Sequence, residues 1–408
     1  VKSGFLKTLI ILLTKKAKKT TVTFVLVFIC IIASIVGDLS YVVLVPLSAL
    51  LFLYGKRSPI IGIITSFAAL TCGSGISFFL TSVDSSLITM TLTNAHIISG
   101  EYVIGSWSYI FVMFVLIIAM SVIITNISEG IIAKKVPKYD FPEEDVEEEL
   151  VLTKRKMRGL IFSLGAGLIY LLIFIYNIIP GLPFSGNLLD YSQDLYIDKL
   201  FSYDSFFSNG FVFIVAVLFV ILGLAYGIGA KTINNNKEFI DSLGHSLNGI
   251  GKILVMIFAV SIFINIFKES NIGNVIAAAF ANLISTSNFG GLPLLIFLFL
   301  ATVISSLFLP NAINSWAIFS STVPALMQVG VSPEFTQLVY RLGGSVAIGL
   351  TPVFVYFIVY LAFMENYNQS NKPVTMLEAV KYQMPYALIT LGTFLIVIIV
   401  WYITGIPL

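Results

Sequence analysis

Long runs of uncharged apolar residues constrain this chain more than any other feature of its sequence. Four stretches carry no charged side chain at all: residues 21–36, 110–124, 211–226 and 387–401. Only 11% of the 408 residues are charged, whereas soluble domains usually carry about a quarter. A helix crosses a bilayer with roughly 20 apolar residues. The sequence therefore predicts an all-α polytopic protein of the cell (inner/plasma) membrane, with the lipid bilayer as its surroundings.

Basic residues mark the loops that are expected on the cytoplasmic side. Lysine and arginine gather between the apolar runs, in residues 15–19, 56–57, 134–138, 154–158, 231–237 and 372–381. The segment 181–209 instead carries four aspartates against one lysine. By the positive-inside rule, the basic loops are cytoplasmic and the acidic segment lies outside.

Two segments are predicted to be re-entrant helical hairpins. Residues 21–55 lie between two cytoplasmic basic clusters, so they form either two full crossings or a hairpin whose tip stops inside the membrane. The runs are short, and the tip at residues 34–40 is polar, which favours the hairpin. A second hairpin is expected at 292–328, with a polar tip at 310–316. Polar backbone at membrane depth is tolerated only where protein encloses it.

The two hairpins occur in a mirrored order. Asp38 precedes Pro46 by eight residues, and Trp316 precedes Pro324 by the same spacing. Each hairpin is followed by a span interrupted at glycines, near residues 73–75 and 343–344. One glycine cluster alone is more simply a packing notch between helices. Two tips and two breaks in mirrored order predict an inverted-repeat secondary transporter with its binding site at the midplane.

The predicted organisation is a first repeat at 1–135, a charged cytoplasmic linker at 136–157 and a second half at 158–408. The first repeat holds an amphipathic segment, the hairpin 21–55, a broken span at 58–94 and a span at 106–130. The second half holds spans at 158–180, 210–228 and 251–268, the hairpin 292–328, a broken span at 333–366 and a span at 383–403. Two spans precede the second hairpin and none precedes the first, so we expect the first repeat to lack two spans, about 60 residues.

Several motifs together resemble one transporter family. They are Gly37–Leu47, Ala225–Ile233, Phe308–Trp316, Ser332–Glu334 and Tyr340–Gly343. In this order they are similar to the aminobenzoyl-glutamate transporter (AbgT) family, from inside its second transmembrane helix to the C-terminus. The resemblance implies a homodimeric transporter with two re-entrant hairpins. It also implies transport of p-aminobenzoyl-glutamate, or export of sulfonamides, driven by an ion gradient.

The resemblance also maps the family's site residues onto this chain. Those retained are Asp38, Asp84, Trp316, Arg341 and Pro352. Others are changed: Ser34, Ser77 and Ile348 replace asparagines, Gly344 replaces an acid, and Ile313 replaces a serine. The changed groups include oxygen ligands that a sodium ion needs. We therefore predict coupling to protons rather than sodium, through Asp38 and Asp84, with Ser34 and Ser77 beside them.

The expected substrate site combines residues of the second hairpin tip and the second break. Its members are Asn311, Asn314, Ser315, Trp316, Arg341, Gly344 and Pro352. Arg341 needs a partner because a charge at membrane depth costs about 2.5–3.5 kcal/mol. That partner is a substrate carboxylate, which the guanidinium binds with two hydrogen bonds, or an internal acid such as Asp84.

Each of these residues also has a purely structural interpretation. Arg341 can belong to a structural ion pair, and Asp84 can cap a helix. Trp316 can stack on an aromatic solute or fill a packing site. Asn311 and Asn314 can bind a solute or form the turn at the tip.

Enzymatic activity is not expected. No Walker loop, zinc-protease motif or nucleophile elbow occurs in the sequence. We expect a small-molecule substrate, no nucleic-acid partner, and no cofactor or metal other than a coupling cation. Two alternatives stay open: a transporter of other carboxylates in the same superfamily, and a truncated inactive remnant or membrane scaffold.

Overall fold

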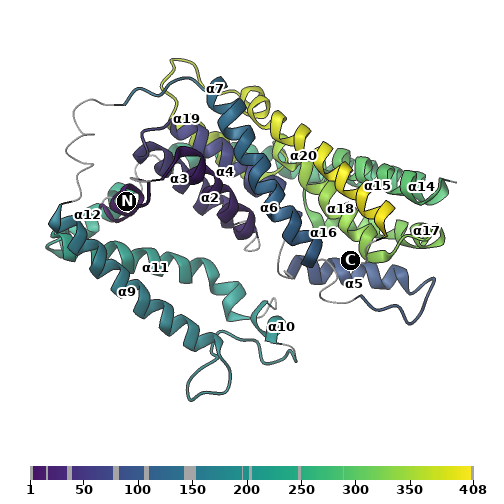
Figure 1. Cartoon of the computed structure of the whole chain (residues 1–408), viewed down its shortest axis with the longest axis horizontal. Helices are drawn as coiled ribbons and strands as arrows, with labels where there is room; N and C mark the ends of the chain where they lie inside the picture. The colour runs from purple at the N-terminus through teal and green to yellow at the C-terminus, as the bar shows by residue number, and fades with distance from the viewer. Residues whose placement is uncertain are drawn as a thin grey trace. The chain divides into compact units, whose positions relative to one another are not determined.

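The computed structural model describes residues 3–14, 17–34, 39–76, 82–104, 110–141, 153–194, 196–201, 205–246, 250–287 and 289–405. Within these ranges every regular element is a helix, as the sequence predicts (Figure 1). The predicted site residues Asp38 and Ser77 lie outside the described residues. The chain divides into two compact units. The α9–α11 unit comprises Val1–Lys18, Tyr54–Lys56 and Asp140–Gly251, and the core unit comprises Lys19–Leu53, Arg57–Tyr139 and Lys252–Leu408.

Two long antiparallel helices build the α9–α11 unit. Its helices are α1 (Phe5–Thr14), α9 (Lys154–Ile178), α10 (Tyr196–Phe201), α11 (Phe206–Ala230) and α12 (Asn236–Ser246). Where α9 packs on α11, a Cβ on Gly159 would lie 2.8 Å from the Cβ of Ala230. Only a glycine permits this close approach. Hydroxyl groups of α9 bond to carbonyls of α11, as from Ser163 to Leu222 at 2.8 Å.

The predicted amphipathic segment forms α1, which packs against α9 and α11. The Thr8 hydroxyl lies 2.6 Å from the hydroxyl of Tyr226 on α11. Phe5 meets the edge of the same ring, with centroids 6.1 Å apart. Phe5, Leu6 and Leu9 of α1 thus pack against protein within this unit.

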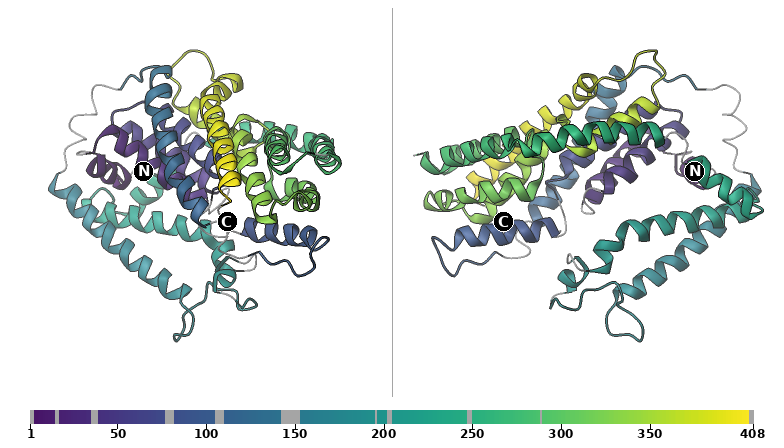
Figure 2. Two further views of the ribbon diagram at one scale, coloured as in Figure 1. Left: turned by 45° about the vertical axis from the view of Figure 1, so that its right-hand side comes forward. Right: turned by 180° about the vertical axis from the view of Figure 1, so that it is seen from behind.

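The core unit holds the two hairpin segments and the two interrupted spans. Its first part contains α2 (Lys19–Ala33), α3 (Leu39–Tyr54), α4 (Pro59–Gly73), α5 (Ser82–Ala95), α6 (Ile110–Ile127), the π-helical turn η2 (Ser128–Ile132) and α7 (Ala133–Lys135). Its second part contains α13 (Ile250–Glu269), α14 (Ile272–Thr286), α15 (Gly291–Ser306), α16 (Ala312–Phe319), η3 (Ser320–Thr322), α17 (Val323–Gln328), α18 (Pro333–Ala347), η4 (Ile348–Leu350), α19 (Val355–Asn366) and α20 (Met376–Thr404). Helix α14 was not predicted, and it packs beside α15 (Figure 2).

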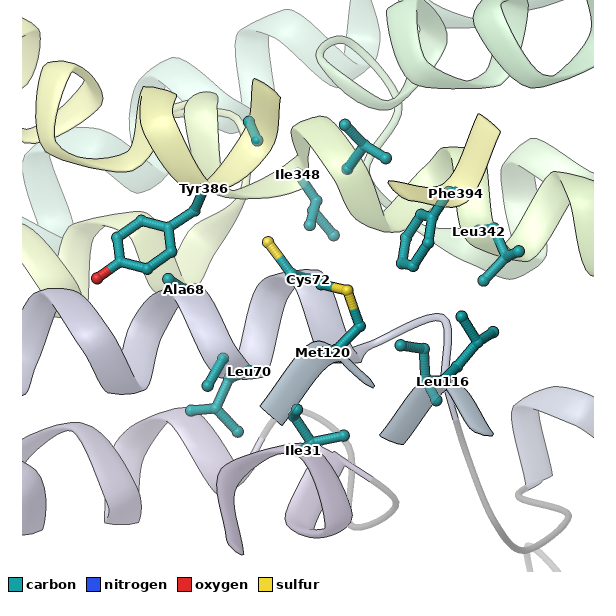
Figure 3. Packing of buried hydrophobic residues seen from close by; sticks show 14 of the residues in the cluster. Ile31, Ala68, Leu70, Cys72, Leu116, Met120, Leu342, Ile348, Tyr386 and Phe394 are labelled. Atoms are coloured by element: carbon teal, nitrogen blue, oxygen red, sulfur yellow. The ribbon is translucent and has the colours of Figure 1, made fainter. Parts of the chain in front are cut away.

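Side chains from both parts of the core unit meet in one apolar core. Figure 3 shows Ile31, Cys72, Met120, Ile348 and Phe394 pointing toward one another from α2, α4, α6, η4 and α20. All five are at most 8% exposed. Cys72 is a free thiol, as is Cys30. The first and second parts of the core unit are therefore packed together.

Several expected crossings are longer helices than those of the expected hairpins. Five helical segments in the described residues are long and apolar enough to cross a membrane: Phe111–Lys135, Lys154–Ile178, Phe213–Ala230, Pro333–Asn366 and Met376–Thr404. Helices α2 and α15 have 15 and 16 residues. At about 1.5 Å per residue, each is shorter than the roughly 30 Å of a hydrocarbon core. Such lengths suit half-crossings, and the re-entrant geometry stays a prediction.

The second interruption lies later in the chain than predicted. Helix α18 continues through Gly343 and Gly344 to Ala347, and the helical path breaks at residues 348–354. Gly343 serves close packing against α15 instead of a bend. The break follows from Pro352, because the residue before a proline avoids helical dihedrals. Thr351 is accordingly extended, with φ −112° and ψ 132°.

Candidate functional site

The two interrupted spans pass each other with their backbones nearly touching. The first runs from α4 through residues 74–81 into α5, and the second runs from α18 through 348–354 into α19. A Cβ on Gly75 would lie 2.5 Å from the carbonyl oxygen of Arg341. A Cβ on Gly349 would lie 2.9 Å from Oγ1 of Thr71. We call this region, residues 71–76 with 341–354, the crossing.

An ion pair joins the two spans at the crossing. Arg341, on α18, pairs through Nη1 with Oδ1 of Asp84 in the first turn of α5. Its Nη2 donates to the Ser74 carbonyl oxygen at 3.0 Å. The two charged side chains are only 9% and 13% exposed. The arginine thus contacts both ends of the first interruption, and its internal partner is Asp84, one of the two partners that the sequence allowed.

The neighbouring glycines of α18 have opposite surroundings. A Cβ on Gly343 would overlap Oγ1 of Thr302 and lie 2.8 Å from the Phe299 carbonyl oxygen on α15. A Cβ on Gly344 would meet nothing within 4 Å. Gly344 stands three residues after Arg341, so about one helical turn away on the same face. Open space therefore lies at Gly344, one turn along α18 from Arg341.

Trp316 is enclosed by protein. The Trp316 side chain is fully buried, and its ring centroid lies 4.4 Å from that of Tyr340. The indole Nε1 donates to the Leu87 carbonyl oxygen at 3.2 Å and to Oγ1 of Thr91 at 3.0 Å. Thr91 in turn donates to Oε1 of Gln337 at 2.6 Å. The indole therefore fastens the second hairpin tip to α5 and α18 in this conformation.

The polar side chains at the predicted tip of the second hairpin are partly exposed and partly buried. Asn311 caps α16, accepting from the Asn314 backbone N–H at 2.9 Å, and both asparagine side chains are exposed. Ser315 is buried. Pro352 follows Thr351, whose hydroxyl donates to the Leu307 carbonyl oxygen at 2.7 Å. The second interruption is thus tied to the tip.

Ser34, at the end of α2, approaches the first interruption. Its hydroxyl donates to the Ile31 carbonyl oxygen at 2.6 Å. The carbonyl oxygens of Gly73 and Ile76 lie 3.2 and 3.5 Å away. Three carbonyl oxygens thus surround one hydroxyl, near the tip where Asp38 follows in the sequence.

A second, partly buried ion pair was missed by the sequence analysis. Arg57, in the connection from α3 to α4, donates through Nη2 to Oε1 of Glu129 at 2.7 Å. Thr23 donates to the same oxygen at 2.5 Å and accepts from Arg57 Nη1 at 2.9 Å. The guanidinium also lies over the Phe52 ring, 4.2 Å from its centroid. The available signal was Glu129 itself, the one charge in the run 110–133.

Outside the spans, the segment after α5 is held to the start of α18. Tyr102 donates through its hydroxyl to Oε2 of Glu334 at 2.7 Å. Burial and the adjacent Glu334 carboxylate raise the pKa of Tyr102. Among the described residues no group of three His, Cys, Asp or Glu side chains is placed to hold a metal ion.

Comparisons with known proteins agree with this architecture. The profile of a family described as "AbgT putative transporter family" matches residues 1–408. The p-aminobenzoyl-glutamate transport protein of Escherichia coli strain K12 is 26% identical over 412 aligned residues, which cover 99% of this chain and 77% of that protein.

Two solved structures are also similar. The YdaH transporter of Alcanivorax borkumensis, described as having an unusual topology, gives a TM-score of 0.59 at 23% identity, covering 100% of this chain and 83% of that one. MtrF of Neisseria gonorrhoeae, described as illuminating a class of antimetabolite efflux pumps, gives 0.55 at 27% identity, covering 98% and 78%.

Proposed function

The chain belongs to the AbgT transporter family, and we propose that it is an ion-coupled secondary transporter of p-aminobenzoyl-glutamate or a related aromatic, carboxylate-bearing solute. Its family and its long apolar helices make it a multi-pass protein of the inner or plasma membrane. In the proposal it works by alternating access, and the same site serves sulfonamides if the physiological direction is export. The E. coli relative's name supports the substrate class.

The observation that carries this proposal is the placement of Arg341. The guanidinium is buried at the crossing, held by Asp84 and by the Ser74 carbonyl oxygen. One turn along the same helix face, a Cβ on Gly344 would meet nothing within 4 Å. A guanidinium binds a carboxylate with two parallel hydrogen bonds. A solute carboxylate entering from the Gly344 side replaces Asp84 as the counter-charge.

This exchange gives a route for proton coupling. When Asp84 takes up a proton it no longer competes for Arg341, and the solute carboxylate binds in its place. Proton binding and solute binding then favour each other, and the linkage is reciprocal. Asp38 would act beside Asp84, and Ser34 with Ser77 would line the same path. Sodium is disfavoured because the asparagines and the acid expected from the family are serines, isoleucine and glycine here.

The substrate is tested by binding to the purified protein. We expect p-aminobenzoyl-glutamate to bind, p-aminobenzoic acid to bind more weakly, and the glutamate dimethyl ester to be rejected, because esterification removes the carboxylates. If the dimethyl ester binds as well as the free acid, Arg341 does not recognise a carboxylate and the proposal is wrong.

The coupling ion is tested in proteoliposomes. Between pH 8 and pH 5.5 the solute carboxylates stay ionised, since the pKa of a glutamate carboxyl is about 4.3. We expect affinity to increase as the pH falls, and an inward pH gradient to drive uptake. Asp84→Asn should bind the solute with no pH dependence. Uptake that depends steeply on sodium and ignores the pH gradient would contradict proton coupling.

We also propose that the protein is a homodimer. The α9–α11 unit supports this, since many apolar residues of α9 face outward, for example Ile161 at 63% and Leu168 at 61% exposed. Lipid or a second copy covers such a surface. Multi-angle light scattering of the detergent-solubilised protein gives the number of copies, and a protein mass of one chain would contradict the dimer.

A further inference from the structure

A groove separate from the crossing opens between α20 and the end of α6. It has a volume of about 710 Å³, and η2 and α7 form one wall while the first half of α20 forms the other. Both walls belong to the core unit. In Figure 1, α7 and the first turns of α20 lie at the same end of that unit. The helices around the groove are irregular, with a π turn at Ser128–Ile132 and Pro385 inside α20.

The lining changes character along the groove. At one end lie Lys135 of α7 and Lys381 of α20, and both side chains are exposed. Glu378 also lines this end, where it accepts a hydrogen bond from the Tyr382 hydroxyl at 3.4 Å. Two ammonium groups against one carboxylate leave the lining with a net positive charge.

Farther along α20 the lining is apolar. Met384, Leu388 and Ile389 are 40%, 61% and 37% exposed. Residues 381, 385 and 388 follow one another at spacings of four and three, so they share one face of the helix. The cationic end of the groove thus continues directly into an apolar part that follows the axis of α20.

The positive-inside rule predicts on which side of the membrane the cationic end lies. Lys134, Lys138 and Lys372 lie in the same two connections, which the positive-inside rule places in the cytoplasm. Basic clusters between helices on that side attract the anionic headgroups of the inner leaflet. A soluble anion would bind the lysines and leave the apolar part of the groove unfilled.

We propose that this groove binds an anionic phospholipid of the cytoplasmic leaflet. Its phosphate lies between Lys135 and Lys381, and one acyl chain follows Met384 and Leu388 along α20. The lipid bridges α6 and α20, so it stabilises the contact between them. This inference is independent of the proposed substrate, and its test requires no transport.

The test compares lipid binding to the full chain and to variants, by native mass spectrometry and thermal unfolding in detergent. Phosphatidylglycerol is the probe, with phosphatidylcholine and inorganic phosphate as comparisons. We expect phosphatidylglycerol to bind more tightly than phosphatidylcholine and to raise the unfolding temperature, and inorganic phosphate to do neither. Loss of one lysine should raise the dissociation constant about fivefold, and Lys135→Gln/Lys381→Gln about thirtyfold.

Two controls keep the result specific. Lys134→Gln/Lys372→Gln removes the same charge on the same side from residues that do not line the groove, and should leave binding within twofold. Leu388→Trp fills the apolar part without touching the lysines and should also weaken binding. Equal loss in both lysine pairs would reveal only general surface attraction. Unchanged binding in Leu388→Trp, or stabilisation by inorganic phosphate alone, would each overturn the lipid assignment.

Discussion

Two arginine–carboxylate pairs of the core unit differ in how completely their partners enclose them. Arg57 and Glu129 share Thr23, and the Phe52 ring covers the guanidinium. Arg341 pairs with Asp84 and one backbone carbonyl, with open space at Gly344 one turn away. The first pair forms a closed triangle, whereas the second has an open position one turn along α18, at Gly344.

This difference separates a structural ion pair from a candidate binding site. Breaking a buried pair on one side is costly because it leaves the other charge uncompensated. The triangle of Arg57, Glu129 and Thr23 joins α2, the α3–α4 connection and the π turn, so it has reason to stay intact. In the proposed function, a solute carboxylate replaces Asp84 at the crossing and keeps Arg341 compensated. Burial alone would not have distinguished the two pairs.

The largest expected effect is on solute binding. Arg341→Ala should weaken binding of p-aminobenzoyl-glutamate about 100-fold, since two charge-assisted hydrogen bonds are lost, together about 2.7 kcal/mol. Arg57→Ala should leave the affinity within twofold, because Arg57 has no contact with the crossing. Calorimetric titration of both purified variants measures this comparison.

Protein yield decides between the two interpretations of Arg341. We expect Arg341→Ala to be produced at normal yield, because Asp84 can then be neutralised by a proton. If the yield collapses and the double variant Arg341→Ala/Asp84→Ala restores it, Arg341 is a structural partner of the same kind as Arg57. The comparison between the pairs would then fail.

The next effect is on the stability of the fold, and here the larger change is expected at Arg57 and not at Arg341. Arg57→Ala should destabilise the fold by about 2 kcal/mol. That is below the cost of about 3–5 kcal/mol for a fully buried pair, because the Glu129 side chain keeps 22% exposure. Adding Glu129→Gln should recover part of the loss by removing the uncompensated charge. Thermal unfolding in one detergent measures both variants, and an unchanged unfolding temperature for Arg57→Ala would refute the structural role.

A third substitution closes the open side of the crossing. Gly344→Asp places a carboxylate one turn from Arg341, in space that holds no atom within 4 Å of the new Cβ. This acid competes with the solute, so affinity should fall about tenfold, or about 1.4 kcal/mol, at unchanged yield. Gly343→Asp is the matched control, and it should fail to fold because its Cβ would overlap Thr302. Equal affinity in Gly344→Asp and the unaltered protein would show that solute does not approach from this side.

The sequence predicted the helical class and most element positions because apolar runs and basic loops report directly on membrane helices. It missed α14, since a 15-residue helix is too short to be recognised by a search for full crossings. It placed the second break at Gly343 because a glycine looks alike whether it bends a helix or admits a neighbour. Only the surroundings of each glycine, supplied by α15, separate these roles.

The candidate site was predictable in part. A buried Arg341 must have a partner, so Asp84 could be named as one option. Choosing it required the packing of segments 257 residues apart in the chain. The enclosure of Trp316 by Tyr340 and Thr91 also depends on tertiary contacts, so its stacking on a solute stays a prediction. Thr23 offered no signal, because a threonine in an apolar helix commonly bonds to its own backbone.

The smallest expected effect tests whether the triangle depends on its third member. Thr23→Val keeps the shape of the side chain and removes the hydroxyl that contacts both Arg57 and Glu129. Two hydrogen bonds are lost, but Arg57 and Glu129 still satisfy each other, so the loss should be only about 1 kcal/mol. Thr21→Val lies on the exposed side of the same helix and should change stability by less than half as much. Thermal unfolding of the two variants, measured side by side with solute titration, gives the answer.

If Thr23→Val is as costly as Arg57→Ala, the hydroxyl and the charge act as one unit. If it is no more costly than Thr21→Val, the pair stands alone, and the triangle no longer distinguishes Arg57 from Arg341.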